Sequence, residues 1–173
     1  MNNKFEFSKP IDVLRLPAGG GTYAIAASAE ERAALAVRFG LLSLDRLEAQ
    51  VQLEPAAGGF YRLSARMSAD LTQACVVTLE PVASHIEESF SLLYGTPDDQ
   101  DEVLLDGDSE TIEPLEGGIV DIGEAVAQQL SLALDPFPRA KSAEIPAAPM
   151  ESGEPRLDSP FAVLAKLRKG EGA

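Results

Sequence analysis

The chain has 173 residues, of which 45% are hydrophobic and 24% charged, enough for one compact domain with a tail. No apolar run approaches the roughly 20 residues of a membrane-spanning helix, and the N-terminus lacks the apolar segment of a secretory signal. A single cysteine excludes an intrachain disulfide, and a single histidine excludes a site built on two imidazoles. We therefore expect a soluble cytoplasmic protein with no membrane contact.

The net charge of −14 is concentrated in one part of the chain. Residues 67–138 contain 16 acidic residues and no Lys or Arg, whereas the rest of the chain has 14 basic and 12 acidic residues. This acidic stretch repels phosphate, so direct RNA contact would use flanking residues such as Arg62 and Arg66. It suits a basic protein partner, because complementary fields accelerate encounter. The alternative is that the acidity only keeps the protein soluble.

The first forty residues are predicted to contain short strands, a turn and a helix. Alternating apolar residues indicate strands at 5–8 and 11–13, which a proline separates. The glycine-rich residues 17–21 indicate a flexible turn, since a phosphate-binding loop would need Gly-Lys-Ser/Thr ahead of a helix. Ser28, with a glutamate three residues later, has the pattern of a capping box and predicts a helix at Ala29–Phe39.

Three segments with a period of two are predicted to form the core sheet. They cover residues 47–53, 61–77 and 86–94, and a Pro/Gly-rich turn joins the first two. Such alternation is typical of antiparallel sheets with one solvated face. The predicted fold class is therefore α+β, with a curved or barrel-like antiparallel sheet against which two helices pack. The residues expected to be buried are Leu63, Ala65, Met67, Leu71, Phe90 and Leu92.

The second half of the chain is expected to be less regular. Residues 96–118 are rich in Asp and Glu and predict a mobile acidic loop, whose carboxylates lack the spacing of an EF-hand calcium loop. A capping box precedes a second helix at 122–134. We expect residues 1–139 to form the domain, with a Pro/Ala/Ser-rich linker at 140–158. The last residues, 159–173, predict a short amphipathic helix for docking on the domain or on a partner, with Phe161, Leu164 and Leu167 on its apolar face.

No residue pattern predicts catalysis. Strand parity points Cys75 toward the core, where a lone cysteine is usually an inert small hydrophobe. The same parity points His85 outward, so the two side chains are not expected to form a nucleophile and base pair. We therefore expect no enzymatic activity, no cofactor and no small-molecule substrate.

The run LTQACVVTLEPV at residues 71–82, followed by IEESF at 86–90, resembles the YceD family, the large ribosomal RNA subunit accumulation proteins of bacteria and plastids. Further similar segments are DIGEAVAQQL at 121–130, LDPFPR at 134–139 and SPFAVLAKL at 159–167. The resemblance extends from about residue 47 to the C-terminus. The residues that match the central motif of the family are Cys75, Leu79, Glu80 and Pro81.

The resemblance also shows a departure from the family pattern. Many relatives have Cys-x-x-Cys-Leu-Glu-Pro at this motif and further cysteines in the last third, and four such thiolates could hold structural zinc. Here the second position is Thr78, and residues 136–139 contain no cysteine. We expect no metal site in this chain, and a structural role for the turn around Leu79, Glu80 and Pro81.

The family resemblance implies a role in the synthesis, processing or stability of bacterial 23S ribosomal RNA without an established catalytic activity. The leading hypothesis is a factor that contacts a basic ribosomal protein or a precursor of the large subunit. One alternative is direct RNA binding through Arg62 and Arg66 with a basic tail, and another is a general acidic adaptor protein. The basic tail residues are Lys166, Arg168 and Lys169, and the expected partner contacts are Asp98, Asp99, Asp101, Glu102, Asp106 and Asp108.

Overall fold

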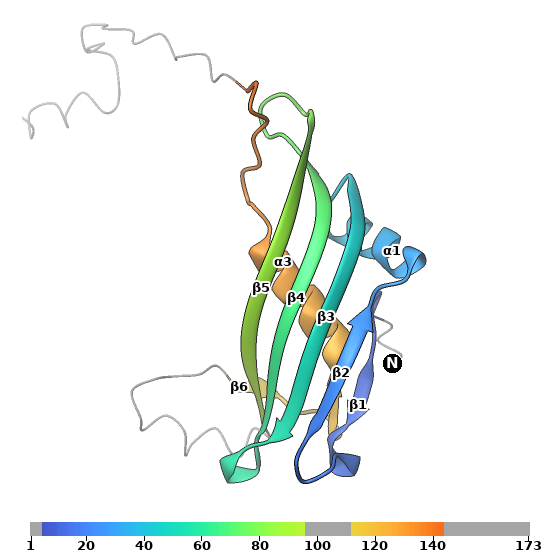
Figure 1. The fold of residues 1–173 in the computed structure, drawn as a ribbon, viewed down its shortest axis with the longest axis vertical. Coiled ribbons are helices and arrows are strands. Elements are labelled where there is room, and N and C mark those ends of the chain that lie inside the picture. Colours follow the sequence, from blue (N-terminus) through green and yellow to red (C-terminus); the bar gives the residue numbers. More distant parts are fainter. Residues whose placement is uncertain (1–4, 96–111, 144–173) are drawn as a thin grey trace, which may run out of the picture. The chain divides into compact units, whose positions relative to one another are not determined.

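The computed structural model describes residues 5–95 and 112–143 (Figure 1). Its main feature is one five-stranded sheet in the order β2-β3-β4-β5-β6. The strands are β2 (Gly21–Ala26), β3 (Ser43–Pro55), β4 (Tyr61–Ala74), β5 (Pro81–Gly95) and β6 (Ile112–Pro114). All neighbouring strands are antiparallel except β5 and β6, which are parallel. The α+β class is confirmed, but the barrel-like alternative is wrong because β2 and β6 do not pair and the sheet stays open.

A second, two-stranded sheet and two helices complete the described fold. Strands β1 (Pro10–Asp12) and β7 (Ile119–Asp121) pair antiparallel, and short 3₁₀ turns lie at Val13–Arg15 and Ala57–Gly59. The helices are α1 (Ala29–Phe39) and α3 (Ile122–Ala133). In Figure 1, α3 crosses behind the strands of the large sheet, so that one sheet face is covered and the other is open. No helix in these described ranges is long and apolar enough to cross a membrane.

The core lies on the covered face of the sheet and follows the predicted alternation. Leu63, Ala65, Met67 and Leu71 of β4 are all buried, together with the matching residues of β3. Phe90 and Leu92 pack against this core but are only partly buried. The reason is their place on β5, beyond which the sheet has only the three-residue strand β6.

Both predicted helices are present, and one cap differs from its prediction. Ser28 and Glu31 form a reciprocal capping box at the start of α1. The Asp121 side chain caps α3 by accepting hydrogen bonds from the backbone N–H groups of Gly123 and Glu124. The reciprocal half of this second capping box is replaced, because the Glu124 carboxylate binds Arg38 of α1 instead.

Several sequence predictions of local structure need correction. Residues 5–8 form a turn rather than a strand, and β1 begins at Pro10 instead of being interrupted there. Residues 21–26, directly after the predicted turn, form the unpredicted strand β2, because β3 supplies its ladder. Residues 112–118, the end of the predicted acidic loop, instead contain β6 and a turn ahead of β7. These short strands form only because β5 and β1 offer them a pairing edge.

Candidate functional site

The family-motif residues lie at the turn of the β4–β5 hairpin. Strand β4 ends at Ala74, three residues before the predicted end, because the backbone turns around Cys75. The Cys75 N–H donates to the Glu80 carbonyl at 2.8 Å, and the Leu79 N–H donates to the Cys75 carbonyl at 3.0 Å. The Cys75 Sγ atom also accepts from the N–H groups of Val77 and Thr78, each at 3.4 Å. The turn is thus organised around one buried side chain.

The segment that follows α3 is bound to this turn. The Val76 N–H donates to the Pro138 carbonyl at 2.9 Å, and Gln73 Nε2 donates to the Asp135 carbonyl at 2.9 Å. On the other side, Ser142 Oγ donates to Glu80 Oε2 at 2.8 Å. We call this set of contacts between residues 73–80 and 135–142 the clasp. It joins segments 62 residues apart in the sequence.

The clasp presents an exposed apolar surface, which we call the tip patch. It consists of Val76, Val77, Leu79 and Phe137, and the side chains of Leu79 and Phe137 are 75% and 69% exposed. Leu79 also has a positive φ of 61°, in the left-handed region that favours glycine. Because the Leu79 side chain is exposed, it contributes little folding stability to offset the strain of its backbone.

The chemistry of Cys75 is set by hydrogen-bond donors rather than by a base. The Thr78 hydroxyl beside the sulfur, together with backbone N–H groups of Ala140, Thr78 and Val77, lowers the pKa of the Cys75 thiol to about 6. His85 lies on the open sheet face, where its Nδ1 atom is 2.6 Å from Asp70 Oδ1. Cys75 is buried in the turn and His85 is exposed, so the arrangement does not pair a nucleophile with a base.

The residues at the turn do not fit structural zinc. A zinc site of the type implied by the resemblance needs four thiolates or imidazoles, and this chain supplies one cysteine and one histidine. Thr78 stands at the second cysteine position of the motif, and its hydroxyl oxygen lies 3.1 Å from Glu80 Oε2. Within residues 5–95 and 112–143, no three His, Cys, Asp or Glu side chains are grouped as metal ligands would be. Hydrogen bonds hold the clasp together.

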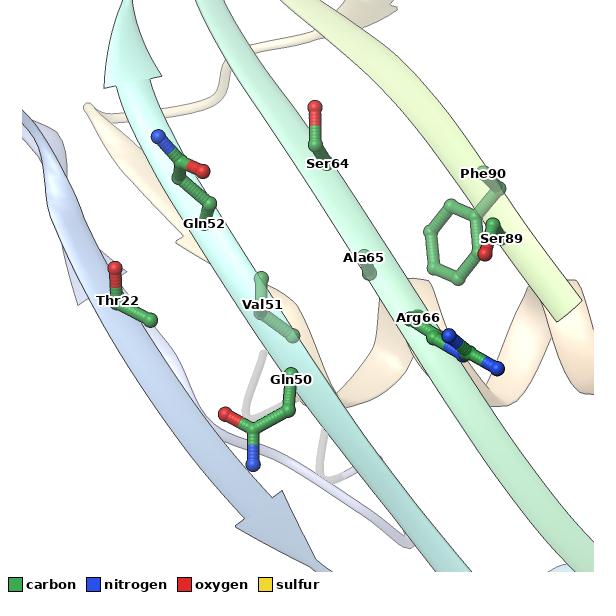
Figure 2. Close-up of a pocket in the computed structure, with 9 residues that line it drawn as sticks. All are labelled: Thr22, Gln50, Val51, Gln52, Ser64, Ala65, Arg66, Ser89 and Phe90. Atoms are coloured by element: carbon green, nitrogen blue, oxygen red, sulfur yellow. The ribbon is translucent and has the colours of Figure 1, made fainter. Parts of the chain in front are cut away.

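The open face of the sheet carries the predicted RNA contacts, Arg62 and Arg66. Figure 2 shows part of this face, where the side chains of four adjacent strands surround a shallow hollow of about 350 Å³. Its polar lining is mainly uncharged, with Thr22, Gln50, Gln52, Ser64 and Ser89 around Arg66. Arg66 pairs with Glu87 at 3.1 Å, and Arg62 contacts the Ser91 hydroxyl at 3.4 Å. The Arg66–Glu87 ion pair reduces the charge that the face offers to phosphate.

The remaining predicted contacts lie outside the described residues. These are Asp98, Asp99, Asp101, Glu102, Asp106 and Asp108 of the acidic stretch, Phe161, Leu164 and Leu167 of the predicted docking helix, and Lys166, Arg168 and Lys169 of the basic tail. Conversely, no sequence pattern indicates that Val76, Val77 and Phe137 belong to one exposed patch. Phe137 lies between two prolines, a pattern typical of an extended segment, but the sequence does not show that this segment lies against the hairpin turn.

Together, these features define an α+β sheet protein with an open polar face and an apolar hairpin tip. Residues 63–168, more than half of the chain, match the family model of the large ribosomal RNA subunit accumulation protein YceD. The chain belongs to this family, as the motif predicted, and the family description assigns it a role in accumulation of the RNA of the large ribosomal subunit. No curated protein and no solved structure matches the chain.

Proposed function

We propose that this protein is a non-enzymatic factor of ribosome biogenesis that supports the synthesis, processing or stability of 23S ribosomal RNA. In this proposal it docks on a basic ribosomal protein or on a precursor of the large subunit. The observation that carries the docking role is the tip patch. Its residues are exposed and apolar, they sit on a turn fixed by the clasp, and Leu79 is part of the family motif.

The strain at Leu79 supports a binding role for its side chain. A left-handed conformation costs an L-residue roughly 1–2 kcal/mol relative to glycine, and the Leu79 side chain buries little surface in return because it is 75% exposed. Residues held in sparsely populated backbone conformations cluster at functional positions. Leu79 and Phe137 are exposed apolar side chains of the same clasp, and apolar anchors of this kind contribute much of the binding energy at protein interfaces.

The charge distribution supports a basic partner. Residues 67–138, which contain the turn and α3, carry 16 acidic side chains and no Lys or Arg. Complementary charge accelerates encounter, while apolar anchors determine how long the complex lasts. We infer a division of roles in which the acidic stretch captures the partner and the tip patch retains it.

The substitution Leu79→Gly tests this proposal. Glycine relieves the left-handed strain, and its entropic cost of roughly 0.5–1 kcal/mol offsets part of the gain. We expect a melting temperature equal to or above that of the wild type. We expect weaker recovery of large-subunit proteins with the tagged full-length chain, and poor restoration of 23S RNA in a deletion strain.

Two further variants make the test specific. Leu79→Asn also tolerates the left-handed region and should behave like Leu79→Gly. Val37→Ala removes an equally exposed apolar side chain from α1, away from the turn, and should behave like the wild type. Full restoration of 23S RNA by both Leu79 variants, with unchanged recovery of partners, would contradict the docking role.

Direct RNA contact is the second candidate, because Arg62 and Arg66 lie on the same open face. A phosphate-binding protein binds naked RNA and loses affinity steeply as salt rises. Binding of purified 23S RNA that disappears in an Arg62→Ala, Arg66→Ala double variant, while Leu79→Gly binds normally, would favour this candidate over docking on a protein.

A further inference from the structure

The two edges of the large sheet differ in how they resist pairing with another strand. Strand β6 has three residues and ends at Pro114, and both shortness and proline protect an edge. Strand β2 has six residues, Gly21–Ala26, without proline or charge, and its pairing with β3 has no bulge. In Figure 1, β2 lies along one side of the sheet and β1 is drawn beside it, but β1 pairs with β7 in the second sheet and not with β2. The β2 edge therefore lacks the features that normally block strand addition.

The orientation of the β2 backbone follows from the ladder with β3. The Ala27 N–H donates to the Leu47 carbonyl at 2.9 Å, and the register pairs Ile25 with Ala49 and Tyr23 with Val51. Because hydrogen-bonded pairs alternate along an antiparallel ladder, Thr22, Ala24 and Ala26 direct their N–H and C=O groups away from β3. Among the described residues, these groups have no partner.

The side chains of β2 leave its edge unobstructed on the open face of the sheet. Thr22, Ala24 and Ala26 are small and exposed on the open face, whereas Tyr23 and Ile25 point to the core face and stay only partly buried. Residues 16–28 contain no charged side chain. In a chain with a net charge of −14, this is a surface at which another acidic molecule can approach with little local repulsion.

We propose that β2 pairs antiparallel with β2 of a second copy of this chain. The register with the most hydrogen bonds places Ala24 opposite Ala24 of the second copy and Thr22 opposite Ala26. It forms about six main-chain hydrogen bonds, two for each of its three hydrogen-bonded pairs. The same register places Tyr23 opposite Ile25 twice on the core face, and aromatic residues opposite β-branched ones are favourable cross-strand pairs. The edge is thus complementary to itself.

The interface is small, and this sets the expected behaviour. One added strand with two Tyr–Ile pairs falls at the lower end of specific interfaces, so the dimer should be weak and concentration-dependent. Both copies carry net negative charge, and therefore added salt should strengthen the dimer by screening their repulsion. This dimerisation goes beyond the proposed ribosomal role, and its interface does not include the tip patch.

Sedimentation velocity of the full-length chain over a range of concentrations tests the proposal. The wild type should shift from monomer to dimer as its concentration rises. Ala24→Pro should stay monomeric yet folded, because its lost N–H faces away from β3 and proline is tolerated at such edge positions. Ala24→Lys keeps the N–H but places two like charges opposite each other, and it should also be monomeric. Ala24→Ser, the matched control, should dimerise like the wild type.

A cross-linking measurement identifies the occupant of the edge. In a Cys75→Ser background, Ala24→Cys should cross-link to a second copy with a short bis-maleimide. Ser64→Cys, on the same face but on β4, should not. A wild type that stays monomeric at its highest soluble concentration would overturn the proposal, as would dimerisation that persists in Ala24→Lys. Cross-links from Ala24→Cys only to other proteins would overturn it as well, by assigning the edge to a different partner.

Discussion

Cys75 shows how a single residue can connect local geometry to pH dependence. Its sulfur accepts hydrogen bonds at the centre of the hairpin turn, and these donors favour the thiolate over the thiol. The pKa of the Cys75 thiol is about 6 in the folded chain, whereas an unfolded thiol has a pKa near 8.5. Between these pH values the unfolded chain holds a proton that the folded chain has released, so stability rises with pH.

We expect the Cys75 contribution to stability to be fully present above about pH 8.5 and to be lost as pH falls through about 6. The measurement is the free energy of unfolding in urea at several pH values, for the wild type and for Cys75→Ala. The difference between the two proteins isolates Cys75 from other groups that titrate in this range. Parallel pH profiles would show that the folded thiol has an ordinary pKa.

At the scale of elements, one ion pair joins the two helices. Arg38 of α1 binds the Glu124 carboxylate of α3 through both Nη atoms, at 2.9 and 2.7 Å, and Gln128 Nε2 donates to the same carboxylate at 3.1 Å. Glu124 is 5% exposed. The two parallel hydrogen bonds of this pair raise the pKa of Arg38 above its ordinary value. They also fix the two helices relative to each other.

Removal of Arg38 should therefore destabilise the protein by leaving a buried carboxylate unpaired. We expect Arg38→Ala to lower the free energy of unfolding by about 2–3 kcal/mol, less than for a fully buried pair because Arg38 keeps some contact with solvent. Arg15→Ala is the control, since the Arg15–Asp12 pair is exposed and should contribute under about 0.5 kcal/mol. If urea denaturation gave the same loss of unfolding free energy for both variants, the Arg38–Glu124 pair would contribute no more to stability than an exposed pair.

For the whole molecule, the clasp is expected to be independent of metal. The purified full-length protein should contain no stoichiometric zinc, and a chelator should leave its melting temperature unchanged. The reason is the donor set at the turn, where one thiol and the Glu80 carboxylate stand among hydroxyl and amide groups, fewer ligands than the four of a structural zinc site. Elemental analysis that finds one zinc per chain would contradict this expectation.

The acidic stretch allows a second prediction for the whole molecule. It concerns a variant in which six acidic residues are replaced by Asn or Gln: Asp98, Asp99, Asp101, Glu102, Asp106 and Asp108. We expect an unchanged melting temperature, because charges on a loop predicted to be solvated contribute little to stability, and slower association with the proposed basic partner. Restoration of 23S RNA in a deletion strain should be poor. In the control variant, the five acidic residues between positions 144 and 171 are neutralised instead. Equal effects of the two sets of substitutions would indicate that the acidic residues serve only to keep the protein soluble.

The sequence by itself determined the features that depend on short-range periodicity. The alternation in residues 61–71 predicted which side chains of β4 are buried, because a strand has a period of two. The motif at Ser28 and Glu31 predicted the start of α1, since a capping box is satisfied within one turn. The family motif identified the hairpin that carries the candidate site, and the family match confirmed this resemblance.

Only the tertiary structure decided how distant segments meet. Glu124 binds an arginine 86 residues away instead of completing its predicted cap, because the carboxylate is buried beside α1 and needs a charged partner there. Phe137 reaches the turn because the clasp holds its segment beside Val76, and β2 and β6 exist as strands because β3 and β5 offer them a ladder. A local pattern reports the period of a segment, whereas pairing, burial and strain depend on which neighbours the folded chain brings to it.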